Sequence, residues 1–313
     1  MPDFKILITD GLASAGQAIL KAAAGVEDRP DISAADLLSA VPDFDALIIR
    51  GRTRLTAQVF GAAGRLKAVG RAGVGVDNID LEAARKHSVT VVNAPDSTTI
   101  AVAELTFGLL LSVARELPRA DSAMKNGQWL KQELEGVELN GKTLGVIGFG
   151  RIGMELSRRA AAFGMSVVAY DPFVEAGNIK SLGAEPLALD ELYSCSDFIS
   201  LHLPLSVQTR DMIGRLAFSQ MKDGVRIVCA ARGGIIDEPA LLEALNSGKV
   251  AGVGLDVFAA EPPGLTDLIR HPRVISTPHI GAQTLEAQVR AAMDIADEVL
   301  AALRGAPLRW KVA

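Results

Sequence analysis

The sequence contains few of the residues that cross-link small folds or bind metals. Its 313 residues include 2 cysteines and 4 histidines, and aromatic residues make up 4% of the chain. Cys195 and Cys229 lie far apart in apolar segments, which excludes a disulfide framework and a cysteine-rich zinc site. We therefore expect a protein without a metal centre that resides in a reducing cytoplasm.

Positive charge and long apolar runs are also scarce. Lysine and arginine number 32 against 37 acidic residues, which gives a net charge of -5. Such a chain has no basic field for nucleic acid or an anionic membrane, so any anionic ligand must be bound by local cations. The most apolar stretch, residues 100–114, contains Glu104 and is shorter than the roughly 20 residues that span a bilayer. Residues 1–10 lack the apolar core of a signal peptide, so we expect a soluble protein.

Apolar residues are abundant, and their spacing predicts an α/β fold with two domains. The hydrophobic fraction is 49%, and the length exceeds that of a usual single domain. Short runs of Ile, Leu and Val alternate with helical patterns, which is typical of βαβ units and parallel sheets. The expected strands are residues 5–9, 46–49, 66–70 and 89–93, followed by 144–147, 167–170, 198–201, 226–229, 253–257 and 274–276.

The breaks between these strand and helix patterns predict the domain boundaries. Residues 93–97 are rich in turn formers and separate the two series of strands. The last helical pattern, residues 284–303, has no strand of its own, so we expect it to return to the first domain. The prediction is two Rossmann-like domains: a doubly wound parallel sheet over residues 98–283, and a smaller domain from residues 1–97 plus 284–313.

A glycine-rich motif follows the first strand of the second series. Gly148, Gly150 and Gly153 form G-x-G-x-x-G between residues 144–147 and a helical pattern. These glycines permit a tight turn, the approach of a pyrophosphate, and close helix packing. The next strand ends at Asp171, whose carboxylate suits an adenosine ribose and repels a 2′-phosphate, so NAD is favoured over NADP. The alternative interpretation is a structural turn with an N-capping aspartate.

Three polar residues follow successive strands of the same series. Arg232 comes after residues 226–229, Glu261 after residues 253–257, and His279 after residues 274–276. The carboxyl ends of parallel strands share one edge, where α/β proteins bind ligands. A histidine titrates near neutral pH, a neighbouring carboxylate raises its pKa, and an arginine binds a carboxylate through two donors. Taken singly, each residue could equally be a loop or turn residue. The other three histidines look structural.

Longer motifs around these residues indicate a family. The sequence resembles the D-isomer-specific 2-hydroxyacid dehydrogenases in residues 70–78, 144–153, 230–237, 254–258 with 261–263, and 278–282, a likeness that covers nearly the whole chain. The resemblance implies an NAD-dependent dehydrogenase in which His279 exchanges the hydroxyl proton, Glu261 pairs with it, and Arg232 orients the substrate. It implies further cofactor contacts at Arg151, Ile152, Pro204, Ala230, Asp256 and Gly281.

The resemblance also implies how the domains are used. The discontinuous domain, flavodoxin-like in such enzymes, would bind a small anionic 2-hydroxy or 2-keto acid. The helix from residue 98 and residues 124–140 would form the contact of a homodimer. Because the chain ends at Ala313, we do not expect the regulatory domain that some members carry.

Arginines in the first domain predict a second anion on the substrate. Arg50 and Arg71 follow the strands 46–49 and 66–70, and Arg52 and Arg54 share the loop of Arg50. Arg232 already suits the carboxylate, so the others favour a phosphate, with backbone N–H groups at Gly73 and Val74 beside them. The expected substrate is then 3-phosphoglycerate, oxidised to 3-phosphohydroxypyruvate.

Several alternatives stay open at this point. In one of them the loop arginines are solvated and Arg50 pairs with Asp43 or Asp45. An enzyme with the same residues could instead reduce glyoxylate or hydroxypyruvate, or oxidise D-lactate. A more remote alternative is an NAD-binding corepressor that does no chemistry.

Overall fold

The computed structural model describes residues 4–313 and divides into two compact units. The first unit contains the chain up to Thr99 together with Ala282–Ala313, and the second unit is Ile100–Gly281. Each boundary lies two residues from the predicted one, and the first three residues of the predicted 1–97 segment lie outside the described residues.

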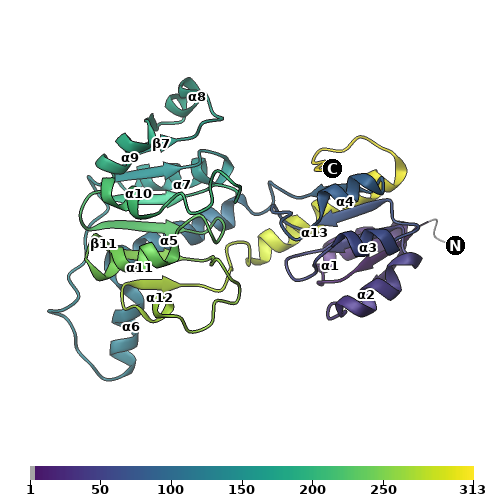
Figure 1. Ribbon diagram of the computed structural model, residues 1–313, viewed down its shortest axis with the longest axis horizontal. Coiled ribbons are helices and arrows are strands. Elements are labelled where there is room, and N and C mark those ends of the chain that lie inside the picture. Colours follow the sequence, from purple (N-terminus) through teal and green to yellow (C-terminus); the bar gives the residue numbers. More distant parts are fainter. Residues whose placement is uncertain (1–3) are drawn as a thin grey trace. The chain divides into compact units, whose positions relative to one another are not determined.

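The first unit is a five-stranded parallel sheet between two layers of helices (Figure 1). The strand order is β2-β1-β3-β4-β5, the flavodoxin-like arrangement of a doubly wound fold. One layer buries Leu37, Phe60 and Ala84, and the other buries Leu20 and Ile295. The elements are β1 (Lys5–Ile8), α1 (Ser14–Ala23), β2 (Gly25–Asp28), α2 (Ala34–Ala40), the 3-10 helix η1 (Val41–Asp43), β3 (Ala46–Ile49), α3 (Ala57–Ala62), β4 (Ala68–Arg71), α4 (Leu81–Lys86), β5 (Thr90–Asn93) and α13 (Leu285–Arg304).

The C-terminal helix α13 packs on β4 and β5. It begins where the side chain of Thr284 accepts a hydrogen bond from the Ala287 N–H, and it ends at Gly305 in the left-handed conformation. The helix comes so close to the sheet that a Cβ on Gly70 would collide with Ile295 and Val299. The tail then pairs with β5, where the Val312 N–H donates to the Val91 carbonyl. The expected return of this helix thus follows from a glycine that leaves room for it.

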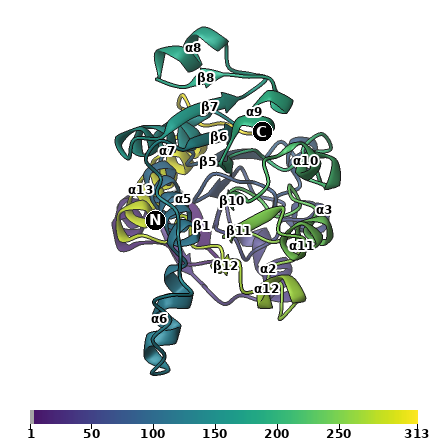
Figure 2. The ribbon, with the colours of Figure 1, turned by 90° about the vertical axis from the view of Figure 1, so that its left-hand side faces the viewer.

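The second unit is a seven-stranded parallel sheet in the order β12-β11-β10-β9-β6-β7-β8. This is the Rossmann order with one added strand, and the order reverses between β6 and β9. Figure 2 shows β8, β7 and β6 toward the top of this sheet and β10, β11 and β12 below them. Helices α5 and α7 cover one face, and α9, α10, α11 and α12 cover the other. The elements are α5 (Thr99–Arg115), α6 (Leu117–Lys125), β6 (Thr143–Ile147), α7 (Arg151–Ala162), β7 (Ser166–Tyr170), α8 (Ala176–Ser181), β8 (Glu185–Pro186), α9 (Leu189–Cys195), β9 (Phe198–Leu201), α10 (Arg215–Gln220), β10 (Val225–Cys229), α11 (Glu238–Asn246), β11 (Val250–Leu255), α12 (Asp267–Arg270) and β12 (Val274–Ser276).

Two strands escape the sequence pattern. Strand β2 is Gly-Val-Glu-Asp and β8 is the dipeptide Glu-Pro, and both lie at sheet edges where little apolar surface is buried. A third difference concerns Arg71, which is the last residue of β4 and not the first residue after it. The predicted α/β fold with two Rossmann-like sheets is confirmed.

Candidate active site

The glycine-rich loop lies at the carboxyl end of β6, beside the point where the strand order reverses. Gly148 has a φ of 93°, and a Cβ there would overlap the His202 carbonyl that follows β9. A Cβ on Gly153 would overlap the Gly148 carbonyl, so α7 can start this close to the loop only with glycine at that position. The sequence therefore forces a tight turn against a neighbouring strand end.

The start of α7 fits the pyrophosphate of a dinucleotide. Gly150 is exposed, and among residues 4–313 no atom other than those of its chain neighbours lies within 4 Å of where its Cβ would be. Within the same described part of the chain, no side chain caps the first turn of α7 and no acidic residue lies in it. Arg151 and Ile152 are its first two residues. An anion placed here meets uncapped N–H groups and the positive end of the helix dipole.

Asp171 connects the loop to the end of β7. One carboxylate oxygen accepts a hydrogen bond from the Phe149 N–H at 2.8 Å, and the other accepts from the Phe173 N–H at 2.9 Å. Each oxygen has a second lone pair, so the group can still accept from the hydroxyls of a ribose. The carboxylate thus shapes the loop in addition to its predicted part in cofactor choice.

We predict that Asp171→Ala erodes the preference for NADH over NADPH. Removal of the negative charge removes the repulsion of a 2′-phosphate, so the ratio of the two dissociation constants should fall by at least about tenfold. Fluorescence titration with each nucleotide measures this ratio without requiring turnover. Asp171→Asn is the matched variant because it keeps an acceptor for the Phe149 N–H. Equal affinity of the unchanged protein for both nucleotides contradicts the prediction.

Two further cofactor candidates also lie at this edge of the sheet. Ala230 is buried directly after β10, and Pro204 is exposed in the loop after β9. The Pro204 carbonyl accepts a hydrogen bond from the Thr209 hydroxyl at 2.7 Å, which fixes that loop. Their predicted cofactor contacts remain proposals.

The structure brings His279 and Glu261 together. Nδ1 of His279 lies 2.7 Å from Oε2 of Glu261, and the other carboxylate oxygen accepts from the Phe258 N–H at 3.1 Å. His279 has a φ of 54°, and its own N–H donates to both the Asp256 and the Thr277 carbonyls. With Nδ1 engaged by the carboxylate, Nε2 is the nitrogen left for exchange with a ligand.

The electrostatics of this pair follow from its hydrogen bond. The hydrogen bond that the imidazole donates to Glu261 raises the pKa of His279 above its usual value, although partial burial and the positive charge of Arg232 oppose the rise. For Glu261, burial disfavours the charged form, but hydrogen bonds from His279 and Phe258 outweigh it and lower the pKa of the carboxyl. Near neutral pH the pair can therefore hold a proton on the imidazole beside an ionised carboxylate.

Arg232 lies in the loop after β10, close enough to influence the pKa of both His279 and Glu261. Its guanidinium donates to the Ala231 carbonyl at 2.6 Å. Cys229, which the sequence pattern left without a role, donates its S–H to the Arg232 carbonyl at 3.8 Å, and burial raises the pKa of that thiol to about 11. The cysteine is thus a neutral internal support for the arginine turn.

Asp256 lies beneath the turn that carries His279. Its side chain is fully buried and accepts hydrogen bonds from the Thr277 hydroxyl and from the N–H groups of Ile280 and Gly281. A Cβ on Gly281 would press against this carboxylate. Asp256 and Gly281 therefore shape the turn that carries His279, and their predicted contacts with the cofactor remain proposals.

In the first unit, Arg50 directly follows β3, as predicted, and is held by residues that the sequence pattern did not single out. Its N–H donates to Asp10 at 2.7 Å, its carbonyl accepts from Asn78 at 2.8 Å, and its guanidinium donates to the Gln283 side chain at 3.3 Å. Pairing with Asp43 or Asp45 is not what the structure has, because Asp45 binds Arg65 and Lys67. Burial lowers the pKa of Arg50, and the negative charge of Asp10 opposes that shift.

Arg52 and Arg71 of the predicted arginine cluster contact backbone carbonyls. Arg52 donates to the backbone carbonyls of Thr9, Pro30 and Ile32 and pairs with Asp10, so it holds the loop together and is not poised for an anion. Arg71, at the end of β4, donates to the Ala72 carbonyl.

The backbone beside Arg71 also differs in part. The N–H of Gly73, which was expected to face an anion, already donates to the Arg71 carbonyl at 2.8 Å. Val74 is exposed, and its carbonyl accepts from Asn93. Of the two backbone groups expected beside an anion, the Gly73 N–H is engaged within its own turn, and Val74 is exposed.

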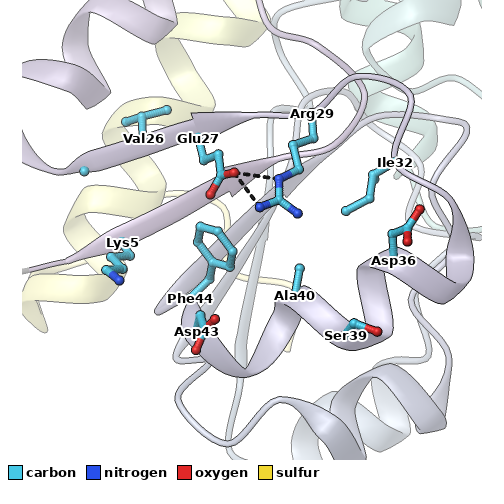
Figure 3. Close-up of a pocket in the computed structure, with 11 residues that line it drawn as sticks. Lys5, Val26, Glu27, Arg29, Ile32, Asp36, Ser39, Ala40, Asp43 and Phe44 are labelled. Atoms are coloured by element: carbon cyan, nitrogen blue, oxygen red, sulfur yellow. Dashed lines mark hydrogen bonds and ion pairs between the residues drawn. The ribbon is translucent and has the colours of Figure 1, made fainter.

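A cavity of about 760 Å³ in the first unit runs along the edge strand β2 and helix α2 (Figure 3). Figure 3 shows Glu27 and Arg29 paired on one side, with Asp36 and Asp43 across from them. Lys5 adds a further positive charge, but the acidic side chains balance the basic ones. The lining therefore has no excess of positive charge that would bind an anion. None of the residues predicted to bind substrate lines it.

Comparison with known proteins decides the family. Residues 107–281 match the model of the D-isomer specific 2-hydroxyacid dehydrogenase, NAD binding domain. The chain belongs to the D-isomer specific 2-hydroxyacid dehydrogenase family. Its second unit is therefore an NAD-binding domain of that family, and the predicted cofactor is confirmed.

Relatives of this dehydrogenase family match nearly the whole chain. D-3-phosphoglycerate dehydrogenase 2, chloroplastic, of Arabidopsis thaliana is 47% identical over 97% of this chain and 49% of its own length. D-3-phosphoglycerate dehydrogenase of Methanocaldococcus jannaschii is 47% identical over 96% of this chain and 58% of its own. The chain thus spans about half the length of these curated relatives. A solved glyoxylate reductase from Paecilomyes thermophila is 32% identical, with a TM-score of 0.91, over 100% of this chain and 99% of its own.

Proposed function

We propose that the protein is an NAD-dependent oxidoreductase that acts at C2 of a small D-2-hydroxy acid. The observation that carries this proposal is the His279–Glu261 pair at 2.7 Å, with Arg232 near both, in the unit that binds NAD. The three residues combine a proton carrier, the carboxylate that holds its tautomer, and a cation for the acid group.

The residues divide the reaction between them. Arg232 binds the substrate carboxylate and orients C2, because a guanidinium matches a carboxylate with two parallel donors. In the oxidation direction His279 takes the hydroxyl proton at Nε2 while the C2–O bond becomes a carbonyl, and in reduction it returns that proton. Glu261 stabilises the imidazolium that forms. NAD, when bound, accepts the hydride from C2 or, as NADH, supplies it.

We further propose that the substrate carries a phosphate, so that 3-phosphoglycerate is oxidised to 3-phosphohydroxypyruvate. Arg50 supports this, since its guanidinium contacts the neutral Gln283 side chain and its backbone is fixed by Asp10 and Asn78. The phosphoglycerate activity in the names of the relatives points the same way.

A substrate panel tests the phosphate. We predict that kcat/KM for 3-phosphohydroxypyruvate exceeds those for hydroxypyruvate, glyoxylate and pyruvate by at least about tenfold, or some 1.4 kcal/mol of transition-state binding. Arg50→Ala should remove most of that advantage, whereas Arg54→Ala, an exposed residue of the same loop, should retain it. Turnover of the panel with no advantage for the phosphorylated acid overturns the phosphate assignment alone.

The alternative is reduction of glyoxylate or hydroxypyruvate, or oxidation of D-lactate. It is favoured by the engagement of Arg52 and of the Gly73 N–H inside the protein, which removes two of the expected phosphate ligands. Equal kcat/KM for hydroxypyruvate and its phosphorylated form would establish this alternative.

The setting of the reaction is also a proposal. We propose a cytoplasmic homodimer with no nucleic acid or membrane partner. The acidic charge supports the absence of nucleic acid, and exposed Leu117, Met124 and Trp129 on and after α6 support a protein contact there. Among residues 4–313, none of the helices has the length and apolarity needed to cross a bilayer. Light scattering of the purified protein measures its mass directly.

A further inference from the structure

Two loops at the carboxyl edge of the second sheet meet at the Phe258–Ala259 peptide. A Cβ on Gly233 would overlap the Phe258 carbonyl, so the loop after β10 and the loop after β11 touch through their backbones. Glu238, five residues after Gly233 in the chain, accepts a hydrogen bond from the Ala259 N–H at 2.7 Å. The peptide is therefore held both by contact and by a charged acceptor.

Phe258, the first residue of this peptide, is joined to the proposed proton carrier by two further hydrogen bonds. The Phe258 N–H donates to Oε1 of Glu261 at 3.1 Å, and Oε2 of Glu261 lies 2.7 Å from Nδ1 of His279. The Phe258 side chain is 6% exposed and packs in the core, which anchors the other end of the peptide. Movement of Ala259 would displace the donor that orients Glu261.

We propose that Glu238 is a positioning residue that holds Glu261 against His279 through the Ala259 amide. As far as turnover is concerned, this proposal rests on the proposed function. Glu238 lies at the first position of α11, so its carboxylate is set by a helix that Asp237 caps through the Ala240 N–H. A rigid helix start is a suitable base for orienting a loop 21 residues further along the chain.

The charges around His279 show how such an effect can be recognised. Glu261 raises the pKa of His279 through its hydrogen bond and its charge, Asp256 also raises it, and Arg232 lowers it. Loss of the Glu238 charge could act on the imidazole through space, and Glu238→Gln measures that effect by itself. A fall in the pKa of His279 in Glu238→Asp, which keeps the charge, therefore reports a displacement of Glu261.

A simpler explanation is that Glu238 only favours the start of α11 through the helix dipole. Two substitutions separate the explanations. Glu238→Asp keeps the negative charge at the helix start but is one methylene too short to reach the Ala259 N–H, while Glu238→Gln loses the charge and keeps an acceptor at the same reach. If Glu238 positions Glu261, Glu238→Asp lowers the pKa of His279 and Glu238→Gln does not. If Glu238 only stabilises the helix start, Glu238→Asp has the smaller effect and Glu238→Gln the larger one.

The experiment is a pH titration of the histidine Cε1–H signals by NMR. With 4 histidines in the chain, loss of one signal in His279→Ala assigns it. Glu261→Gln gives the full fall in the pKa of His279, and we expect Glu238→Ala and Glu238→Asp to produce at least half of that fall. Glu238→Gln should stay near the unchanged protein, as should the control Glu243→Ala, an exposed residue of α11 that pairs with Arg215.

Turnover supplies a second, separable readout. Reduction of a 2-keto acid needs His279 protonated, so the pH above which the rate falls should move downward in Glu238→Asp, in parallel with the NMR titration. An unchanged pKa of His279 in Glu238→Asp overturns the positioning role, whether or not Glu238→Ala folds. If the unchanged protein reduces no 2-keto acid, the proposed function fails, and the NMR titration still decides the role of Glu238.

Discussion

His279→Ala should lower kcat for reduction of the best 2-keto acid by about 10²-fold to 10⁴-fold, the contribution of a positioned general acid. The imidazole supplies the proton for the C2 oxygen. Glu261 cannot replace it, because its lowered pKa keeps the carboxyl ionised and without a proton to give. The binding of NADH should change little, since the glycine-rich loop lies after a different strand. Stopped-flow measurement of NADH oxidation gives kcat directly.

Two further variants test whether the loss of kcat comes from a disturbed backbone or from the removal of any histidine. His279 has a φ of 54°, which asparagine tolerates better than alanine, so His279→Asn should show the same loss with the backbone unchanged. His271→Ala removes a histidine whose ring accepts from the Arg273 N–H after α12, and it should leave kcat unaltered. Near-normal kcat in both His279 variants would show that another group carries the proton.

Arg232→Ala should lower kcat/KM by about 10²-fold to 10³-fold, a loss comparable to removal of a donor that stabilises developing charge. The guanidinium is expected to bind the substrate carboxylate through two donors, and a lysine cannot reproduce that geometry, so Arg232→Lys should recover only part of the loss. Steady-state kinetics with the same acid measure both variants.

The matched control for Arg232 is Arg215→Ala. Arg215 pairs with Glu243 on the surface of the same unit, and an exposed ion pair of this kind contributes little to stability. If Arg215→Ala and Arg232→Ala reduced kcat/KM equally, the effect would come from loss of charge or of folded protein, and Arg232 would have no specific contact with the acid.

The family, the fold and the juxtaposition of the proposed proton-transfer residues could be predicted because each strand and motif is marked by residues close in sequence. Alternating apolar runs and helical patterns predict parallel strands, and a parallel sheet places the ends of all strands at one edge. Arg232, Glu261 and His279 lie in the loops that follow β10, β11 and β12. Their proximity is then a consequence of topology, and the 2.7 Å contact of His279 with Glu261 agrees with it.

The supporting contacts depend on residues far apart in the chain, and no local pattern marks them. Three contacts join separate segments of the chain. Arg52 donates to three backbone carbonyls, buried Asp256 accepts from the turn that carries His279, and Glu238 accepts from the Ala259 N–H. A charged side chain in a loop has the same sequence signature whether it binds a ligand or a backbone. Only the tertiary packing decides which carbonyl or amide lies within hydrogen-bond distance of that side chain. Burial makes an unpaired polar group costly, so the packed structure selects a partner for each one.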